Sequence, residues 1–247
     1  TGDSTGDSTG DESASDAPDP GDSSDASASD GPTIGGLAGN CSVDVTGDYA
    51  ASAEVVRMDL YAGDGKCYAC VVVKNTGTKA IGLRGSFAYR DKDGGALTAL
   101  DSQNSEWEPF VPAGETAFLL NWPWDADADR AASVTCTLTV GEADFDESTR
   151  RYLDVEERSC TSEGLSLRIT NNTDVSVDTP WVLAWGAGEG VCHYDLDDNY
   201  DLSAGESVTM RPGDTWDIDF DFVSDSYDKA AWSDLERYVY AYGNVAQ

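Results

Sequence analysis

CVVVKNTG at residues 70–77 and SLRITNNT at residues 166–173 decide the fold of this chain. Both stretches are rich in apolar, β-branched residues and end in Asn beside further turn residues, which is typical of a strand that leads into a turn. They coincide at a shift of 96 residues, and this shift places Asn75 on Asn171. Self-similarity at a fixed spacing indicates one structural unit that occurs twice.

The repeat extends to both sides of these stretches. Without gaps, the match runs from Glu54–Tyr89 to Arg150–Trp185, and it places the SFAY that ends the first segment on the VLAW that ends the second. Because Trp185 then takes the place of Tyr89, we expect Trp185 to pack between the two sheets of its own domain.

A turn recurs as well. After a small length difference, PAGET at residues 112–116 meets RPGDT at residues 211–215, so a Pro/Gly turn followed by an acid and a β-branched residue is present in both copies. We therefore expect two β-sandwich domains, at residues 40–145 and 146–247.

Short strand-like segments separated by turns make up the first copy, and Asp93-Gly94 is a hairpin signal. Only Asp125–Ala132 and Lys229–Arg237 suggest short helices. The pattern predicts an all-β fold of antiparallel sandwiches. The strands expected in the first copy are Ser42–Val45, Glu54–Tyr61, Cys67–Lys74, Gly82–Tyr89, Ala96–Asp101, Thr116–Leu120 and Ser133–Val140.

Residues 1–39 differ from the rest of the chain. They are mainly Gly, Ser, Asp, Thr, Ala and Pro, with nine acids and no Lys or Arg. Such a segment cannot bury enough apolar area to offset its ordering entropy, so we expect a disordered acidic linker whose charges repel one another. A lipid anchor and O-glycosylation of this linker are both hypotheses.

The composition disfavours some classes of function and indicates a compartment. The net charge of −32 disfavours binding to nucleic acids and to anionic membrane surfaces. Six cysteines, an even number, suggest disulfides and an oxidising compartment. No apolar run is long enough to predict a transmembrane segment, and the absence of a signal peptide is what a mature or trimmed exported protein would show. The acidity fits either a protein from a high-salt environment or an ordinary acidic surface protein.

A family resemblance rests on residues of the first copy. Val71, Val73 and Asn75 end one strand, Phe87-Ala88-Tyr89-Arg90-Asp91 runs into Asp93-Gly94, and Pro112-Ala113-Gly114-Glu115 precedes an aromatic strand. Over about residues 54–140 the chain resembles the FxLYD family of immunoglobulin-like domains in exported prokaryotic proteins and lipoproteins. The resemblance implies two tandem immunoglobulin-like sandwiches, the second divergent, outside the cytoplasm and with no known catalytic residues.

The cysteines are interpreted as structural. Strand parity places Cys67 with Val71 and Val73, and Cys136 with Leu138, on core-facing positions. This favours a Cys67–Cys136 disulfide and leaves Cys41–Cys70, although the pairing in this domain stays open. Cys160–Cys192 is the one pairing wholly inside the second domain. A zinc site or a redox pair at Cys67-x-x-Cys70 is a less favoured alternative.

Clustered acids raise the question of calcium. Asp125, Asp127 and Asp129 have the spacing of a calcium-loop start, and Asp195, Asp197 and Asp201 belong to a second acidic loop. Neither has a complete ligand set, so a solvated acidic surface is the competing interpretation and no other cofactor is expected. Asp217, Asp219 and Asp221 should line the exposed face of a strand that buries Ile218, Phe220 and Phe222.

Trp107, Trp122 and Trp124 flank loops and are the candidates for an exposed ligand-binding surface. Catalysis is not expected, because His193 is the only histidine, no nucleophile-elbow sequence is present, and acid pairs carry no signal among 47 acids.

We therefore predict a non-catalytic, extracellular, cell-surface protein that binds a protein or glycan partner, or self-associates through edge strands. The alternatives are a calcium- or carbohydrate-binding module and, ranked lower, a secreted hydrolase.

Overall fold

The computed structural model describes residues 33–63, 65–100, 109–123, 125–143, 149–188, 191–198, 200, 201, 206–221 and 231–246. The fold is all-β, as the sequence predicts, and the sheets pack face to face as sandwiches. Its only helices within these residues are three single 3-10 turns, η1 (Ala50–Ser52), η2 (Ala128–Arg130) and η3 (Trp232–Asp234). None of them has the length or hydrophobicity needed to cross a membrane.

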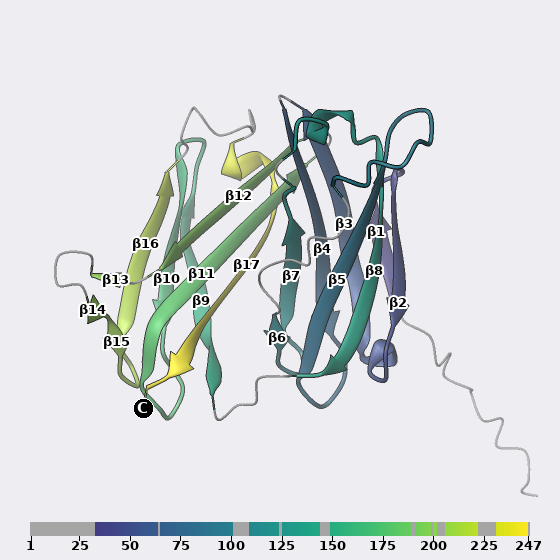
Figure 1. Cartoon of the computed structure of the whole chain (residues 1–247). Helices are drawn as coiled ribbons and strands as arrows, with labels where there is room; N and C mark the ends of the chain where they lie inside the picture. Colours follow the sequence, from purple (N-terminus) through teal and green to yellow (C-terminus); the bar gives the residue numbers. More distant parts are fainter. Residues whose placement is uncertain are drawn as a thin grey trace, which may run out of the picture. The chain divides into compact units, whose positions relative to one another are not determined.

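The first copy consists of two four-stranded sheets (Figure 1). One has the order β1-β3-β4-β7 and the other the order β2-β8-β5-β6. Their strands are β1 (Thr33–Leu37), β2 (Cys41–Thr46), β3 (Ala53–Gly63), β4 (Lys66–Asn75), β5 (Ile81–Arg90), β6 (Phe110–Val111), β7 (Thr116–Asn121) and β8 (Ser133–Glu142).

The second copy has a longer path, β12-β11-β17-β9-β10-β16, with β15 beside β11 and a separate β13-β14 pair. Its strands are β9 (Arg150–Cys160), β10 (Gly164–Thr170), β11 (Val177–Gly188), β12 (Val191–Asp198), β13 (Tyr200–Asp201), β14 (Glu206–Ser207), β15 (Thr209–Met210), β16 (Thr215–Asp221) and β17 (Glu236–Val245).

The two copies share the strand pairing around β4 and β5 on one side and around β10 and β11 on the other. In the first copy β4 pairs with β3 and β7, and β5 pairs with β6 and β8. In the second, β10 pairs with β9 and β16, and β11 pairs with β15 and β17, all of them antiparallel.

Asn75 ends β4 with a fully buried side chain that holds the following turn. Its Nδ2 donates to the Lys79 carbonyl at 2.8 Å and to the Val111 carbonyl at 2.9 Å, and its Oδ1 accepts from the Gly77 amide at 2.9 Å. A buried amide side chain is stable only with its partners in place.

Asn171 does the same after β10. Its Nδ2 donates to the Val175 and Met210 carbonyls, both at 2.9 Å, and its Oδ1 accepts from the Thr173 amide at 3.1 Å. The Pro/Gly turns complete both corners, because Gly114 donates its amide to the Asn75 carbonyl and Gly213 donates to the Asn171 carbonyl.

A β-bulge in β11 changes the correspondence between the two copies by one residue, relative to the match made without gaps. The bulge lies between Asp178 and Trp181, and Thr179 within it has a φ of 41°. After the bulge Ala184, not Leu183, is the counterpart of Phe87. The expectation that Trp185 packs in its own core is therefore wrong: Trp185 is fully buried, but against the first copy.

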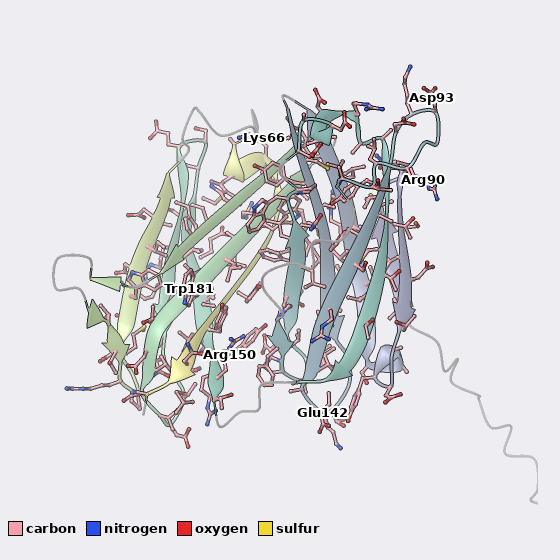
Figure 2. The ribbon with its side chains drawn as sticks, in the orientation of Figure 1. Lys66, Arg90, Asp93, Glu142, Arg150 and Trp181 are labelled. Atoms are coloured by element: carbon pink, nitrogen blue, oxygen red, sulfur yellow. The ribbon has the colours of Figure 1, made fainter. Side chains whose placement is uncertain are left out.

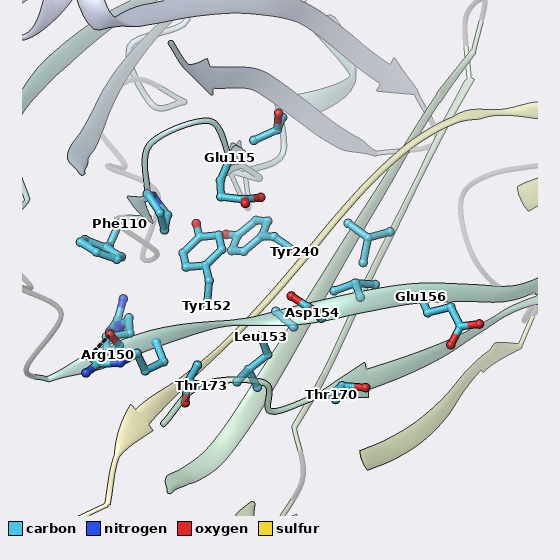
Figure 3. A pocket seen from close by; sticks show the side chains of 16 residues that line it. Phe110, Glu115, Arg150, Tyr152, Leu153, Asp154, Glu156, Thr170, Thr173 and Tyr240 are labelled. Carbon is cyan, nitrogen blue, oxygen red and sulfur yellow. Dashed lines mark hydrogen bonds between the residues drawn. The ribbon is translucent and has the colours of Figure 1, made fainter. Parts of the chain in front are cut away.

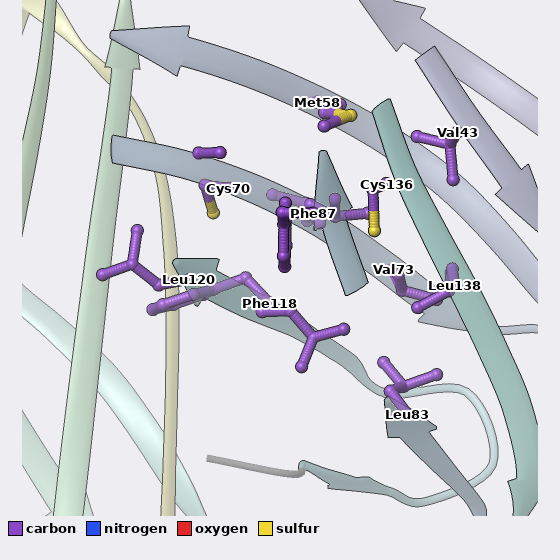
Figure 4. Close-up of a cluster of buried hydrophobic side chains, with 14 of the residues drawn as sticks. Val43, Met58, Cys70, Val73, Leu83, Phe87, Phe118, Leu120, Cys136 and Leu138 are labelled. Atoms are coloured by element: carbon purple, nitrogen blue, oxygen red, sulfur yellow. The ribbon is translucent and has the colours of Figure 1, made fainter. Parts of the chain in front are cut away.

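The layer between the copies belongs to one continuous hydrophobic core. On the first copy Phe118 of β7 and Val72 of β4 face outward, and on the second Tyr240 of β17 meets Phe118 edge-on with ring centroids 5.1 Å apart. Figure 4 shows Phe118, Leu120 and Cys70 in this core. We call this the shared layer; its members are Cys70, Val72, Phe118, Leu120, Leu183, Trp185, Ala187, Tyr240 and Tyr242.

Several details differ from the sequence-based expectations. β1 lies inside the predicted linker and pairs in parallel with β3, and β2 pairs in parallel with β8, so two edges are not antiparallel. Residues 96–100 do not form the expected strand; Arg90 and Ala96 make a single bridge, and Leu97 is buried, while Asp101 lies outside the described residues. The predicted domain boundary falls at residues 144–148, outside the described residues.

Candidate functional site

A cleft of about 750 Å³ opens beside the shared layer, and we call it the junction cleft (Figure 3). The first copy contributes the turn between β6 and β7, and the second contributes β9, β10 and β17. The residues that line it are Phe110, Pro112, Glu115, Thr116, Arg150, Arg151, Tyr152, Leu153, Asp154, Val155, Glu156, Thr170, Thr173, Val239, Tyr240 and Ala241.

The cleft exists because β9 changes partners. β9 pairs with β17 over Arg150–Leu153 and with β10 from Asp154 onward. Where β9 leaves β17 the two strands diverge, and the lining residues Leu153–Glu156 and Val239–Ala241 lie on either side of this fork.

Aromatic rings form the wall toward the first copy. The rings of Tyr152 and Tyr240 are stacked, with centroids 5.9 Å apart and an interplanar angle of 15°. Phe110 meets Tyr152 at 6.1 Å and 59°. Offset and tilted contacts of this kind stabilise aromatic clusters beyond their burial alone.

The Tyr152 hydroxyl is a buried polar group in the wall of the cleft. It is buried, and it has no hydrogen-bond partner among the described residues. Burial raises the pKa of Tyr152 well above its usual value, with Arg150 opposing and the Tyr242 and Glu115 side chains adding to the increase. Because an unpaired buried hydroxyl costs about 1–3 kcal/mol, the fold tolerates a destabilising group here.

Charges of both signs surround this hydroxyl. The guanidinium of Arg150 lies 4.5 Å from the centre of the Tyr242 ring, at the base of the second copy (Figure 2). Glu115, Asp154 and Glu156 provide carboxylates to the same cleft. The arrangement offers cations and carboxylates to a polar ligand that also has an apolar side.

A second, smaller pocket of about 380 Å³ contains one predicted ligand-binding residue. Trp122 is half-buried and lines this pocket together with Tyr68, Lys66 and Asp125. The other two candidates, Trp107 and Trp124, lie outside the described residues.

The Asp125, Asp127 and Asp129 carboxylates are not brought together. Asp125 accepts a hydrogen bond from the Asp127 amide at 2.9 Å, and Asp127 pairs with Arg130 at 2.8 Å. Nowhere in the described part of the chain do three His, Cys, Asp or Glu side chains form a metal-binding group. The side chains of Asp195, Asp197, Asp201 and His193 lie outside that part, so calcium at the second loop stays a prediction.

The cysteines of the first copy occupy two layers. Cys67 and Cys136 face the same core as expected, but they are separate thiols, and the Cys67–Cys136 disulfide is not formed. Parity fixes the face of each strand but not the position along it, and these two strands belong to opposite sheets. Burial raises the pKa of both thiols to about 12.

The Cys41–Cys70 disulfide is not formed either. Cys41 is a half-buried thiol whose pKa burial raises to about 12, whereas Cys70 lies in the shared layer. Cys160 is a thiol at the end of β9, and the side chain of Cys192 lies outside the described residues. Cys160–Cys192 thus stays a prediction that mass mapping has to test.

The sequence does contain a signal for the shared layer beside the junction cleft, and the sequence-based prediction did not use it. YVYAY at residues 238–242 is apolar on both of its faces, and Val72–Val73 and Phe118–Leu120 are similar. A strand that is apolar on both faces is typically covered on both sides. This pattern indicates that the two copies pack against each other.

Comparisons with known proteins do not assign a family. No family model matches the chain, and no curated protein matches it. A Campylobacter jejuni structure, cj0090, has 20% identity over 40% of this chain and 96% of its own, with a TM-score of 0.32. Red sea bream transglutaminase has 14% identity over 77% of this chain and 29% of its own, with a TM-score of 0.23.

A third structure, described as a chaperone–tip adhesin complex of CFA/I fimbriae biogenesis, has 10% identity over 69% of this chain and 90% of its own, with a TM-score of 0.19. With TM-scores this low, none of the three likenesses supports a function for this chain.

Proposed function

We propose that this chain is a non-catalytic, extracellular binding protein of the cell surface, which holds a protein partner in the junction cleft. The acidic segment that precedes β1 would act as its spacer, anchored by a lipid or glycosylated. The observation that carries this function is the buried Tyr152 hydroxyl without a partner, beside stacked rings and charges of both signs. A site that costs stability is typical of a functional surface.

The lining of the cleft supports binding rather than catalysis. Its described residues combine aromatic rings, aliphatic side chains and charged groups, which is the mixture expected of a binding surface. The strongly negative charge of the chain favours a cationic partner.

A pair of Tyr→Phe variants tests this function. Y152F removes the unpaired hydroxyl and should raise the free energy of unfolding by up to about 2 kcal/mol, because a desolvation cost disappears. Y89F is the matched control: the Tyr89 hydroxyl donates to Asn121 at 2.5 Å, so its loss should lower stability by about 1 kcal/mol.

Ligands for the test come from a peptide library screened against the full chain. Peptides selected on the wild type should bind Y152F at least tenfold more weakly and Y89F unchanged. Selected peptides that bind both variants equally would contradict the proposed site.

A second candidate function is saccharide binding at the Trp122 pocket. Trp122 and Tyr68 line it together with the charged Lys66 and Asp125, a combination of aromatic and polar groups that suits a sugar. A glycan array with wild type and W122A tests it: hits that disappear in W122A would establish the site, and an array without hits would exclude it.

A further inference from the structure

Two Asn-x-Ser/Thr triplets occur in the chain, Asn-Cys-Ser at residues 40–42 and Asn-Asn-Thr at residues 171–173. Such a triplet is the acceptor sequence for N-linked glycans when its middle residue is not proline. A glycan also needs an accessible asparagine amide, which the sequence does not show. The structure separates the two triplets, because Asn40 is exposed and Asn171 is buried.

Asn171 has no place for a sugar in the folded protein. Its side chain is fully buried, and both hydrogens of Nδ2 are used, one for the Val175 carbonyl and one for the Met210 carbonyl. A sugar would replace one of these hydrogens and would have to enter the core of the second copy. Thr173 is equally engaged, since its hydroxyl donates to Oδ1 of Asn171 at 2.6 Å. The corner after β10 therefore accounts for this triplet.

Asn40 lies in an exposed turn between β1 and β2. The Cys41 amide closes this turn by donating to the Ala38 carbonyl at 2.9 Å. Beside Asn40, a Cβ placed on Gly39 would meet no atom within 4 Å, so the space next to the turn is open. A sugar attached here would extend into solvent, as is typical of N-linked glycans.

The side-chain amide of Asn40 can carry a sugar and keep its contact. Nδ2 donates to the Ala132 carbonyl at 3.0 Å, and no second acceptor for it is found among the residues that the structure describes. Because a side-chain amide has two hydrogens, one of them stays available. A glycosylated asparagine retains one N–H, so the sugar and the hydrogen bond to Ala132 are compatible.

The other two positions of this triplet are accessible to the same degree or unconstrained. Ser42 is exposed near the start of β2, where its hydroxyl pairs with that of Thr135 at 2.8 Å. Cys41 is a half-buried thiol without a disulfide, so no cross-link fixes the middle of the triplet. The hydroxyl that an acceptor sequence requires is therefore at the surface beside the Asn40 amide.

We propose that Asn40 is an N-glycosylation site and that Asn171 stays unmodified. The co-substrate is an oligosaccharide linked to a lipid phosphate or diphosphate. Nδ2 of Asn40 attacks C1 of the first sugar, the bond from C1 to the phosphate oxygen breaks, and the lipid phosphate leaves with that electron pair while Nδ2 gives up one proton. The inference shares the extracellular location with the proposed function and does not involve the junction cleft.

The position of Asn40 gives the glycan a role at the edge of a sheet. β2 is the outermost strand of the sheet β2-β8-β5-β6, and Asn40 directly precedes it. Edge strands are the usual sites of pairing with a further chain, and a bulky hydrophilic group hinders such pairing. A glycan at this position would therefore protect the first copy from association through β2.

Peptide mapping by mass spectrometry tests the site on the full chain. The chain is secreted from cells that N-glycosylate their exported proteins, with an Asn-Ala-Thr tag after Gln247 as the positive control, and its folded monomer is isolated. We expect a glycan on Asn40 and none on Asn171. The variant S42A keeps Asn40 but removes the acceptor sequence, so it should lose the glycan completely, whereas S42T should keep it.

Only samples with an occupied tag are compared. An unmodified Asn40 in both the wild type and S42T would overturn the proposal, and so would a glycan on Asn40 that S42A retains. A glycan on Asn171 in the folded monomer would contradict the distinction between the two triplets. Binding in the junction cleft is measured separately with Y152F and Y89F, so a failure at Asn40 leaves the proposed function standing, and the reverse also holds.

Discussion

The outward faces of β4 and β7 in the first copy and of β10 and β16 in the second are built from the same positions with opposite chemistry. In the first copy, Val72 lies opposite Phe118 and both are buried in the shared layer. In the second copy, Arg168 lies opposite Asp217, joined by hydrogen bonds of 2.6 and 2.7 Å.

The next pair repeats the contrast. Cys70 lies opposite Leu120 in the first copy, whereas Ser166 donates a hydrogen bond to Asp219 in the second. As predicted for β16, Asp217 and Asp219 are exposed and Ile218 and Phe220 are buried, while the Asp221 side chain and Phe222 lie outside the described residues.

The outward faces of β8 and β17 show the opposite distribution, polar in the first copy and aromatic in the second. Thr135, Thr137 and Thr139 point outward from β8 of the first copy, where their counterparts in β17 are Tyr238, Tyr240 and Tyr242. One apolar face of each copy meets the other, and each remaining face is polar. A contact between unlike faces can continue along a stack, and a polar face disfavours the addition of a further copy.

The largest effect is expected from F118D, which gives the first copy the residue of the second. It buries a carboxylate against Tyr240 and should lower the free energy of unfolding by about 5 kcal/mol or more. F118L, which keeps an apolar side chain, should cost far less. Urea unfolding followed by circular dichroism measures both, and equal values would contradict the shared layer.

At high pH, the buried thiols of the first copy should make folding stability depend on pH. The pKa of Cys67 and of Cys136 is raised from 9.0 to about 12 by burial. A raised pKa favours the protonated form in the fold, so this contribution is complete below pH 9 and is lost as the pH rises toward 12.

The loss amounts to about 4 kcal/mol for each thiol at most. Unfolding curves between pH 8 and 11 for the wild type and C136A measure it, and the variant should depend less on pH. Parallel curves, or a Cys67–Cys136 bond found by non-reducing mass mapping, would contradict the free thiols.

N75A and N171A compare the two corners directly. N75A removes three hydrogen bonds and N171A removes four, and each variant leaves two carbonyls without their donor, so each should cost about 2–4 kcal/mol. Because three of the hydrogen bonds match in the two copies, the two costs should agree within about 1 kcal/mol. Calorimetry tests this, and a large cost at only one corner would mean that the repeat is not energetically equivalent.

The smallest effect on folding is expected from the double variant R168V/D217F, which gives the second copy the residues of the first. The exposed ion pair is replaced by an apolar patch, and the monomer should keep its fold while it associates with further copies. Size-exclusion chromatography with light scattering detects this. A variant whose mass does not rise above that of the wild type at high concentration would show that the polar face is not what prevents association.

The sequence by itself determined the local part of this protein. The strand class, the repeat and the positions of Asn75 and Asn171 all follow from short-range patterns, because turns and strand alternation depend on neighbouring residues. The alternation of Asp217, Ile218 and Asp219 was equally readable.

Tertiary structure decided the rest. A single extra residue in the β11 bulge turned Trp185 from its own core toward the first copy, since a shift of one residue exchanges the two faces of a strand. The junction cleft depends on where β9 leaves β17, and the Cys67–Cys136 distance depends on how two sheets stack. Such long-range geometry is set by packing between distant segments, which no local pattern encodes.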